Sequence, residues 1–167
     1  TDLFEDAYRI PQGTANTSYD ECGRNQHQRW TEFFSNSQLQ PNQADTYELR
    51  AQAIEDHIFH PDYPGQLVWN YVGKDVNGDP YHNPTIHARY GRPILLRLYN
   101  ELPTSHNGFG TPEISLHLHN LHTPSESDGF PGDYFSKTKS GPTLSGPGEY
   151  KDQFYPNVYA GYDDFPK

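Results

Sequence analysis

The chain has 167 residues, which is enough for one domain with a modest hydrophobic core. Only 32% of the residues are hydrophobic and the mean hydropathy is -0.96, but 14% are aromatic. The aromatic content excludes disorder throughout the chain, and the hydrophobic core must be built mainly from Tyr, Phe and Trp. The formal net charge of -10, without any basic run interleaved with aromatic residues, argues against a nucleic-acid partner. No apolar stretch approaches the roughly 20 residues that cross a bilayer, so we expect no membrane span.

The first part of the chain, residues 1–44, is rich in Asn, Gln, Ser, Thr and Asp. Its composition predicts an extended N-terminal arm rather than a second domain. Cys22 is the only cysteine, so it cannot form a disulfide within this chain, and it has no His or Cys at metal-ligand spacing beside it. We therefore leave Cys22 out of the candidate site.

The rest of the chain, residues 45–167, reads as an all-β domain. The 15 Pro and 14 Gly interrupt it too often for long helices, and its strand-like runs are rich in Tyr, Ile, Leu and Val. Predicted strands cover 46–53, 67–72 and 93–100, with a possible further strand at 149–155 and a turn at Asn77-Gly78. These elements suggest a Greek-key β-sandwich, although they are too few to close both sheets. The domain therefore looks incomplete.

Residues 113–120 carry the most informative pattern. Ile114, Leu116 and Leu118 alternate with Glu113, Ser115, His117 and His119. In a strand this alternation places the apolar side chains on the core face and both imidazoles together on the other face. Imidazole suits copper, zinc, iron and nickel, so this face is a candidate metal site.

Three segments together carry a family resemblance: Pro84-Thr-Ile-His-Ala-Arg-Tyr-Gly-Arg-Pro-Ile, His117-Leu-His119-Asn, and Thr123-Pro-Ser-Glu-Ser-Asp-Gly-Phe-Pro-Gly. From about Tyr47 to Asn157 the chain resembles the N-terminal cupredoxin domain of the multicopper oxidases, which include laccases, bilirubin oxidases and phenoxazinone synthases. The His-X-His motif alone is weak, but its fixed distance to Ser-Asp-Gly-Phe-Pro is specific. The resemblance implies a cupredoxin-like β-sandwich.

The resemblance also implies roles for individual residues. His117 would ligate the type 2 copper of a trinuclear centre, and His119 would ligate one of the paired type 3 coppers. Asp128 would lie beside the centre and help to move protons to oxygen during its reduction to water, although a loop Asp that caps backbone N–H groups before Gly129 fits the sequence almost as well. Asn120 departs from the family pattern, because many members have Gly there.

The resemblance further implies that the chain is part of a larger enzyme. The second His-X-His motif of the family would follow the Tyr-Pro-Asn element at 155–157, but the chain stops at Lys167 before it. The type 1 copper and the docking site for the reductant, which is a phenol, a tetrapyrrole or a metal ion, would lie on another polypeptide with the remaining cupredoxin domains. We expect an oxidase that reduces dioxygen, is heteromeric or proteolytically processed, and is extracellular or periplasmic.

Coordination chemistry also indicates, independently of the family, that another polypeptide is needed, because two imidazoles cannot fill the coordination of even one copper ion. A surface docked against them must supply the remaining ligands, so we expect the site to lie at an interface. His122 falls out of register with the pair and is interpreted as a loop residue. Two other classes stay open: a mononuclear His-X-His metalloenzyme of the cupin or carbonic-anhydrase type, and a non-enzymatic copper-binding β-sandwich.

Overall fold

The computed structural model describes residues 44–75, 77–106, 110–131 and 143–158. The arm predicted for residues 1–44 lies outside these ranges except for Ala44, and Cys22 lies outside them as well. Within the described ranges, no helix combines the length and the apolar character needed to span a membrane.

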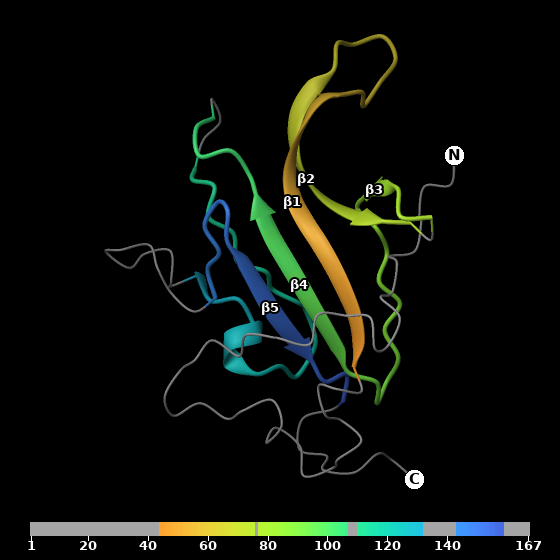
Figure 1. Ribbon diagram of the computed structural model, residues 1–167, viewed down its shortest axis with the longest axis vertical. Helices are drawn as coiled ribbons and strands as arrows, with labels where there is room; N and C mark the ends of the chain where they lie inside the picture. Colours follow the sequence, from red (N-terminus) through yellow and green to blue (C-terminus); the bar gives the residue numbers. More distant parts are fainter. Residues whose placement is uncertain (1–43, 76, 107–109, 132–142, 159–167) are drawn as a thin grey trace.

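The described residues form one five-stranded sheet (Figure 1). Its strands lie in the order β3-β2-β1-β4-β5. β1 and β4 at its centre are parallel, and the other neighbours are antiparallel. The strands are β1 (Asp45–His57), β2 (Gln66–Lys74), β3 (Pro80–His82), β4 (Ile94–Glu101) and β5 (Tyr150–Tyr155). One turn of 3₁₀ helix, η4 (Ser125–Ser127), lies between β4 and β5 in the chain.

One face of this sheet carries the hydrophobic core. The alternation of β1 turns Tyr47, Leu49 and Ala51 to the same side, and the parallel register places Leu96 and Leu98 of β4 beside them. The remaining members of the buried cluster are Ile94, Leu102 and Tyr155. Burial of such side chains contributes roughly 1.5–3 kcal/mol each to the free energy of unfolding. This face therefore fixes where the covering segments must pack.

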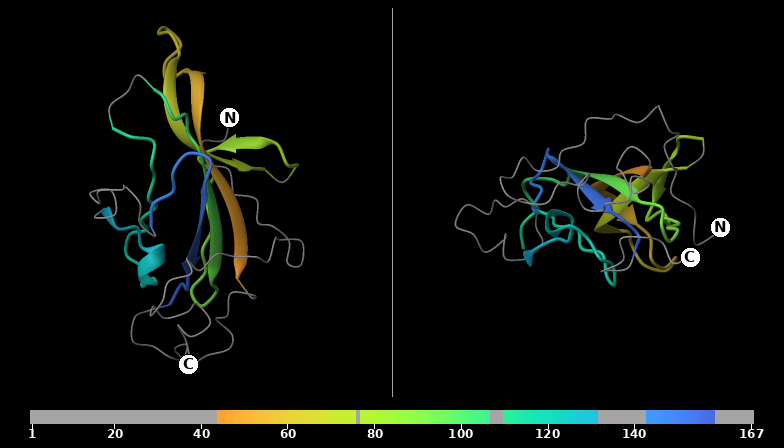
Figure 2. Two further views of the ribbon diagram at one scale, coloured as in Figure 1. Left: turned by 60° about the vertical axis from the view of Figure 1, so that its left-hand side comes forward. Right: turned by 90° about the horizontal axis from the view of Figure 1, so that it is seen from below.

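The covering layer includes two segments that follow β4. We call residues 113–120 the His segment and residues 121–131 the acid loop. Ile114 and Leu116 of the His segment and Leu121 of the acid loop pack against the core cluster. Figure 2 shows both segments on the same side of the sheet, where they pack against it.

The opposite face of the sheet holds a buried ion pair. Arg97 of β4 donates from Nε and Nη2 to the two carboxylate oxygens of Asp152 on β5, both at 2.8 Å. The two residues are register partners, which explains the double contact. Asp152 raises the pKa of Arg97, so this guanidinium stays charged although it is buried.

The predicted all-β class is confirmed, and so are the strands predicted at 46–53, 67–72, 93–100 and 149–155. The prediction of a regular strand over 113–120 is wrong. In the His segment, the ladder consists of a single bridge in which Ile114 and Ser145 exchange N–H···O bonds of 3.0 and 2.9 Å. Asn120 then turns the chain with a φ of 59°, a left-handed conformation that Asn tolerates better than most residues.

Candidate metal site

The two imidazoles of the His segment lie side by side on its exposed side. The ring centroids of His117 and His119 are 5.0 Å apart, and the ring planes are inclined by 59°. Half of the His117 side-chain surface is exposed, while Leu116, the residue before His117, packs on the core. The alternation predicted from the sequence therefore holds for these residues without a continuous strand; Leu118, however, is 39% exposed rather than buried.

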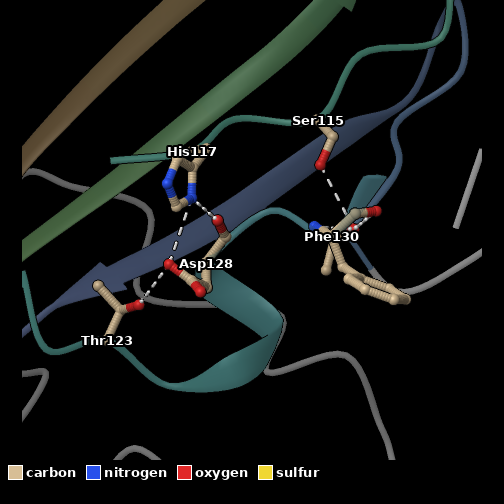
Figure 3. A network of polar contacts seen from close by, with 6 residues as sticks. Ser115, His117, Thr123, Asp128 and Phe130 are labelled. Carbon is tan, nitrogen blue, oxygen red and sulfur yellow. Dashed lines mark hydrogen bonds and ion pairs between the residues drawn. The ribbon is translucent and has the colours of Figure 1, made fainter. Parts of the chain in front are cut away.

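A backbone contact sets the tautomer of His117. Its Nδ1 atom is hydrogen-bonded to the backbone carbonyl of Asp128 (Figure 3). A carbonyl oxygen can only accept, so Nδ1 must carry the proton and donate it. The lone pair of the ring is then on Nε2, the atom that remains available for a metal ion.

The carboxylate of Asp128 lies beside the same ring. Its Oδ1 atom is 3.3 Å from His117 Nδ1, and it accepts a hydrogen bond of 3.1 Å from the Thr123 hydroxyl. These two contacts hold the carboxylate next to the imidazole, with half of its side-chain surface exposed. The structure thus brings Asp128 to His117, as expected from the sequence.

The 3₁₀ turn explains why Asp128 arrives there. Pro124 precedes the turn, and its carbonyl accepts the N–H of Ser127 at 2.9 Å. The fully buried Ser127 hydroxyl then accepts the N–H of Phe154 on β5 at 2.9 Å. The turn is therefore anchored to the edge strand, and Asp128 follows the anchor directly.

Gly129 allows the acid loop to approach the His segment closely. Its φ is +70°, and a Cβ atom there would lie 2.3 Å from the carbonyl oxygen of Leu116. Both the dihedral and the space therefore require glycine. Any side chain at this position would push Asp128 away from His117.

A second tie fixes the other end of the acid loop. The buried Thr143 hydroxyl lies 3.3 Å from that of Ser115 and accepts the N–H of Phe130 at 3.0 Å. Figure 3 shows this tie and the His117–Asp128 contact above the same strand, β5. The site is thus braced on both sides of the imidazole.

Other residues singled out in the sequence are not gathered at this site. Within the described ranges, no three His, Cys, Asp or Glu side chains form a group that could hold a metal ion. His122 lies in the acid loop, where it lines an open hollow of about 600 Å³ with Asn120, Leu121 and Arg89. The described residues therefore do not complete a metal-ligand set around His117 and His119.

Sequence reasoning missed the roles of Thr123, Ser127 and Gly129. The first two carry short hydroxyl side chains flanking a Pro-initiated turn, which is a pattern that often forms local hydrogen bonds. Gly129 follows the candidate acid, where a positive φ is common in turns. The close approach of Gly129 to Leu116 could not be read from the sequence, because it depends on tertiary packing.

No protein-family model matches the chain. A laccase of Bacillus subtilis (strain 168) is 30% identical over 95 residues, which are 48% of this chain and 17% of the laccase. A laccase of Bacillus stratosphericus is 29% identical over 103 residues, which are 54% of this chain and 19% of that laccase. The chain thus spans less than a fifth of the length of these curated relatives. The similarity relates about half of the chain to laccases, and hence to the multicopper oxidases.

Proposed function

We propose that this chain is part of a multicopper oxidase that couples one-electron oxidation of a reducing substrate to the four-electron reduction of dioxygen to water. In this proposal, residues 45–167 supply most of its first cupredoxin domain. The observation that carries the proposal is the pair of exposed imidazoles, 5.0 Å apart, with an acid held against one of them. The similarity to two laccases supports it.

The donor set fits copper, because imidazole nitrogen is a preferred ligand of that metal. His117 would bind the type 2 copper through Nε2, since Nδ1 is engaged by Asp128, and His119 would bind a type 3 copper. The bound copper would supply reversible one-electron chemistry and a place for dioxygen. What this chain contributes is orientation: the Asp128 carbonyl fixes the ring of His117 before any metal arrives.

Asp128 is the residue that we assign to proton transfer. Making water from dioxygen consumes protons, so an acid beside the ligands serves the reaction. The Thr123 hydroxyl donates to Oδ1 of Asp128, and Nδ1 of His117 lies 3.3 Å from the same oxygen, so the carboxylate is held next to the site. The half-exposed carboxylate can exchange protons with solvent or with a docked surface.

Two imidazoles leave the coordination of copper unfilled, so we propose a partner polypeptide with the remaining cupredoxin domains. That partner would carry the second His-X-His motif, the type 1 copper and the docking site for a small-molecule or metal-ion reductant. We further propose an extracellular or periplasmic location, which follows from the proposed enzyme class.

The test is metal analysis of the intact assembly that contains this chain, combined with oxygen uptake and mass spectrometry of every polypeptide present. The proposal requires several copper ions per assembly, the blue absorption of a copper–thiolate centre, and oxygen consumption on addition of a phenolic reductant. One zinc or iron ion without a blue centre would instead identify a mononuclear His-X-His enzyme. Copper without oxygen uptake would identify a binding protein.

A further inference from the structure

One edge of the sheet is open along the first part of β2. β3 pairs only with residues 72–74, so the preceding part of β2 has β1 as its single neighbour among the described strands (Figure 1). Asn83 donates its N–H to the carbonyl of Tyr71 at 2.7 Å, so the backbone groups of Tyr71 point away from β1. Because this direction alternates along a strand, the N–H and C=O groups of Leu67 and Trp69 also point away from β1, where no described strand pairs with them.

The sequence of β2 does not protect this edge. Native proteins usually blunt an open edge with charged side chains or Pro, because unpaired backbone groups recruit strands from other molecules. Residues 66–73 contain neither a charged residue nor Pro. The open edge is therefore suited to pair with a further strand.

The same part of β2 presents apolar side chains on the core side of the sheet. Leu67, Trp69 and Tyr71 alternate along the strand and are 55%, 38% and 39% exposed. The small residues Ala53 and Ala51 are the register partners of Trp69 and Tyr71. A hollow of about 320 Å³ is lined by Ala51, Trp69 and Tyr71 together with Leu102 and Ile114. The hydrophobic core thus continues from Ala51 onto β2, but it is left open there.

We propose that the open edge of β2 and these three apolar side chains form a docking surface for an extended segment of the partner polypeptide, which adds a strand beside β2. The inference rests on the proposed function for the existence of that partner. Main-chain hydrogen bonds to Leu67 and Trp69 supply affinity, and an apolar side chain placed in the hollow supplies specificity. Since the chain spans only 17% and 19% of the two similar laccases, the proposed partner has enough polypeptide to supply such a strand.

Charge favours the partner over a second copy of this chain as the occupant. Residues 51–73 include Glu55, Asp56 and Asp62 but neither Lys nor Arg, and the whole chain has a net charge of -10. Two copies that met at this edge would bring like charges together, whereas a strand flanked by Lys or Arg would be attracted. The occupant is thus an apolar strand with basic flanking residues.

Photo-crosslinking in the intact assembly identifies the occupant. Benzoylphenylalanine in place of Trp69 keeps an aromatic side chain at the docking surface. The same substitution at Tyr63 is the control, because Tyr63 is 67% exposed but lies in the turn between β1 and β2. We expect a crosslink to the partner polypeptide from position 69 alone, identified by mass spectrometry. A crosslink to a second copy or to residues 1–43 of this chain, equal yields at both positions, or none at position 69 would overturn the proposal.

Leu67→Pro tests the open edge itself. Pro removes an N–H that pairs with no described strand, and an edge strand tolerates Pro at such a position. Leu67→Ala is the matched control, because it shortens the same side chain and keeps the N–H. We expect the Kd for the partner to be roughly 10-fold higher in Leu67→Pro than in Leu67→Ala. An equal Kd in the two variants would contradict strand addition.

Trp69→Lys provides a second variant in case Leu67→Pro fails to fold. It keeps every backbone group but places a charge beside the hollow, and Tyr63→Lys adds the same charge away from the open edge. We expect the Kd to rise on the order of 10-fold or more in Trp69→Lys alone. Unchanged binding by Trp69→Lys would remove the apolar side chains of β2 from the docking surface and refute the proposal.

Failure of the proposed function has a different result. An assembly that reduces no oxygen but crosslinks to a partner from position 69 would refute the oxidase and support the docking surface. An active copper oxidase in which position 69 crosslinks to no partner would refute the docking surface alone.

Discussion

The Nδ1 atom of His117 lies 3.3 Å from the Asp128 carboxylate and is also hydrogen-bonded to the backbone carbonyl of the same residue. One residue therefore contacts the ring through two chemically different groups. The carbonyl fixes the tautomer whatever the side chain is, whereas the carboxylate adds a negative charge and a proton acceptor. The two contributions can be separated by mutation.

Asp128→Asn keeps the backbone carbonyl and nearly the same side-chain volume but removes the charge. We expect copper binding to be retained and oxygen reduction to fall by roughly 10²-fold or more, which is the usual contribution of a positioned acid or base. Copper analysis and oxygen uptake on the same preparation measure both effects. Loss of copper in proportion to activity would show that the carboxylate acts through metal retention, contrary to the assignment.

Gly129→Ala should displace the acid loop, because the new Cβ would lie 2.3 Å from the Leu116 carbonyl oxygen. Gly78→Ala is the matched control: its φ is +88°, but nothing lies within 4 Å of the added atom. We expect the control to lose about 1–2 kcal/mol from backbone strain alone. Gly129→Ala should lose at least about 1 kcal/mol more and release copper.

Urea denaturation and metal analysis of the two variants provide the comparison. Equal stability and equal copper content would mean that the close approach of Gly129 to the His segment does not hold the site together.

Asp152→Asn should be strongly destabilising because it leaves the buried Arg97 guanidinium without its charged partner. Removal of one member of a buried pair costs about 3–5 kcal/mol. Glu101→Gln breaks the ion pair with Arg50, in which both side chains are 37% exposed. This change should lower the free energy of unfolding by about 1 kcal/mol or less. Urea midpoints measure both, and similar losses would refute the burial argument.

The free energy of unfolding should decrease at alkaline pH because of the Tyr155 phenol. Burial, followed by Tyr71 and Asp128, raises the pKa of this phenol in the folded chain, while in the unfolded chain the pKa stays near 10. The folded state therefore retains its proton when the unfolded state loses it, and the free energy of unfolding decreases once the pH exceeds about 10. The decrease is at most about 1.4 kcal/mol per pH unit for one group.

Denaturation at several pH values checks this dependence. Tyr155→Phe should show a shallower decline above about pH 10 than the wild type and no difference in slope below it. Identical slopes over the whole range would mean that the phenol is not held protonated by the fold.

Residue patterns predicted much of the fold. The alternation of Tyr47, Leu49 and Ala51 fixes a strand and its buried face, because each side chain turns to the opposite side of the next. The same pattern does not name the neighbouring strand, so the parallel pairing of β1 with β4 was not predictable. Nor was the Arg97–Asp152 pair, which joins residues 55 positions apart.

In the candidate site, too, the residue pattern predicted local orientation but not tertiary contacts. Alternation correctly placed His117 and His119 on one side of the His segment, but it could not show that, among the described residues, the segment forms a single isolated bridge, from Ile114 to Ser145, in place of a strand. The motif spacing indicated Asp128, whereas its double contact with His117 depends on the tight approach of Gly129. Side-chain orientation follows from local geometry, and contacts across loops follow from packing.

The most direct test of the account is electron paramagnetic resonance and copper analysis of the intact assembly carrying His117→Ala, with His60→Ala as the control. His60 is also an exposed imidazole near a carboxylate, since its Nδ1 lies 3.8 Å from Asp62, but it lies in a surface turn. We predict loss of the type 2 copper signal and of oxygen reduction in His117→Ala alone, with the blue centre preserved. A type 2 signal and turnover at wild-type levels in His117→Ala would contradict the assignment.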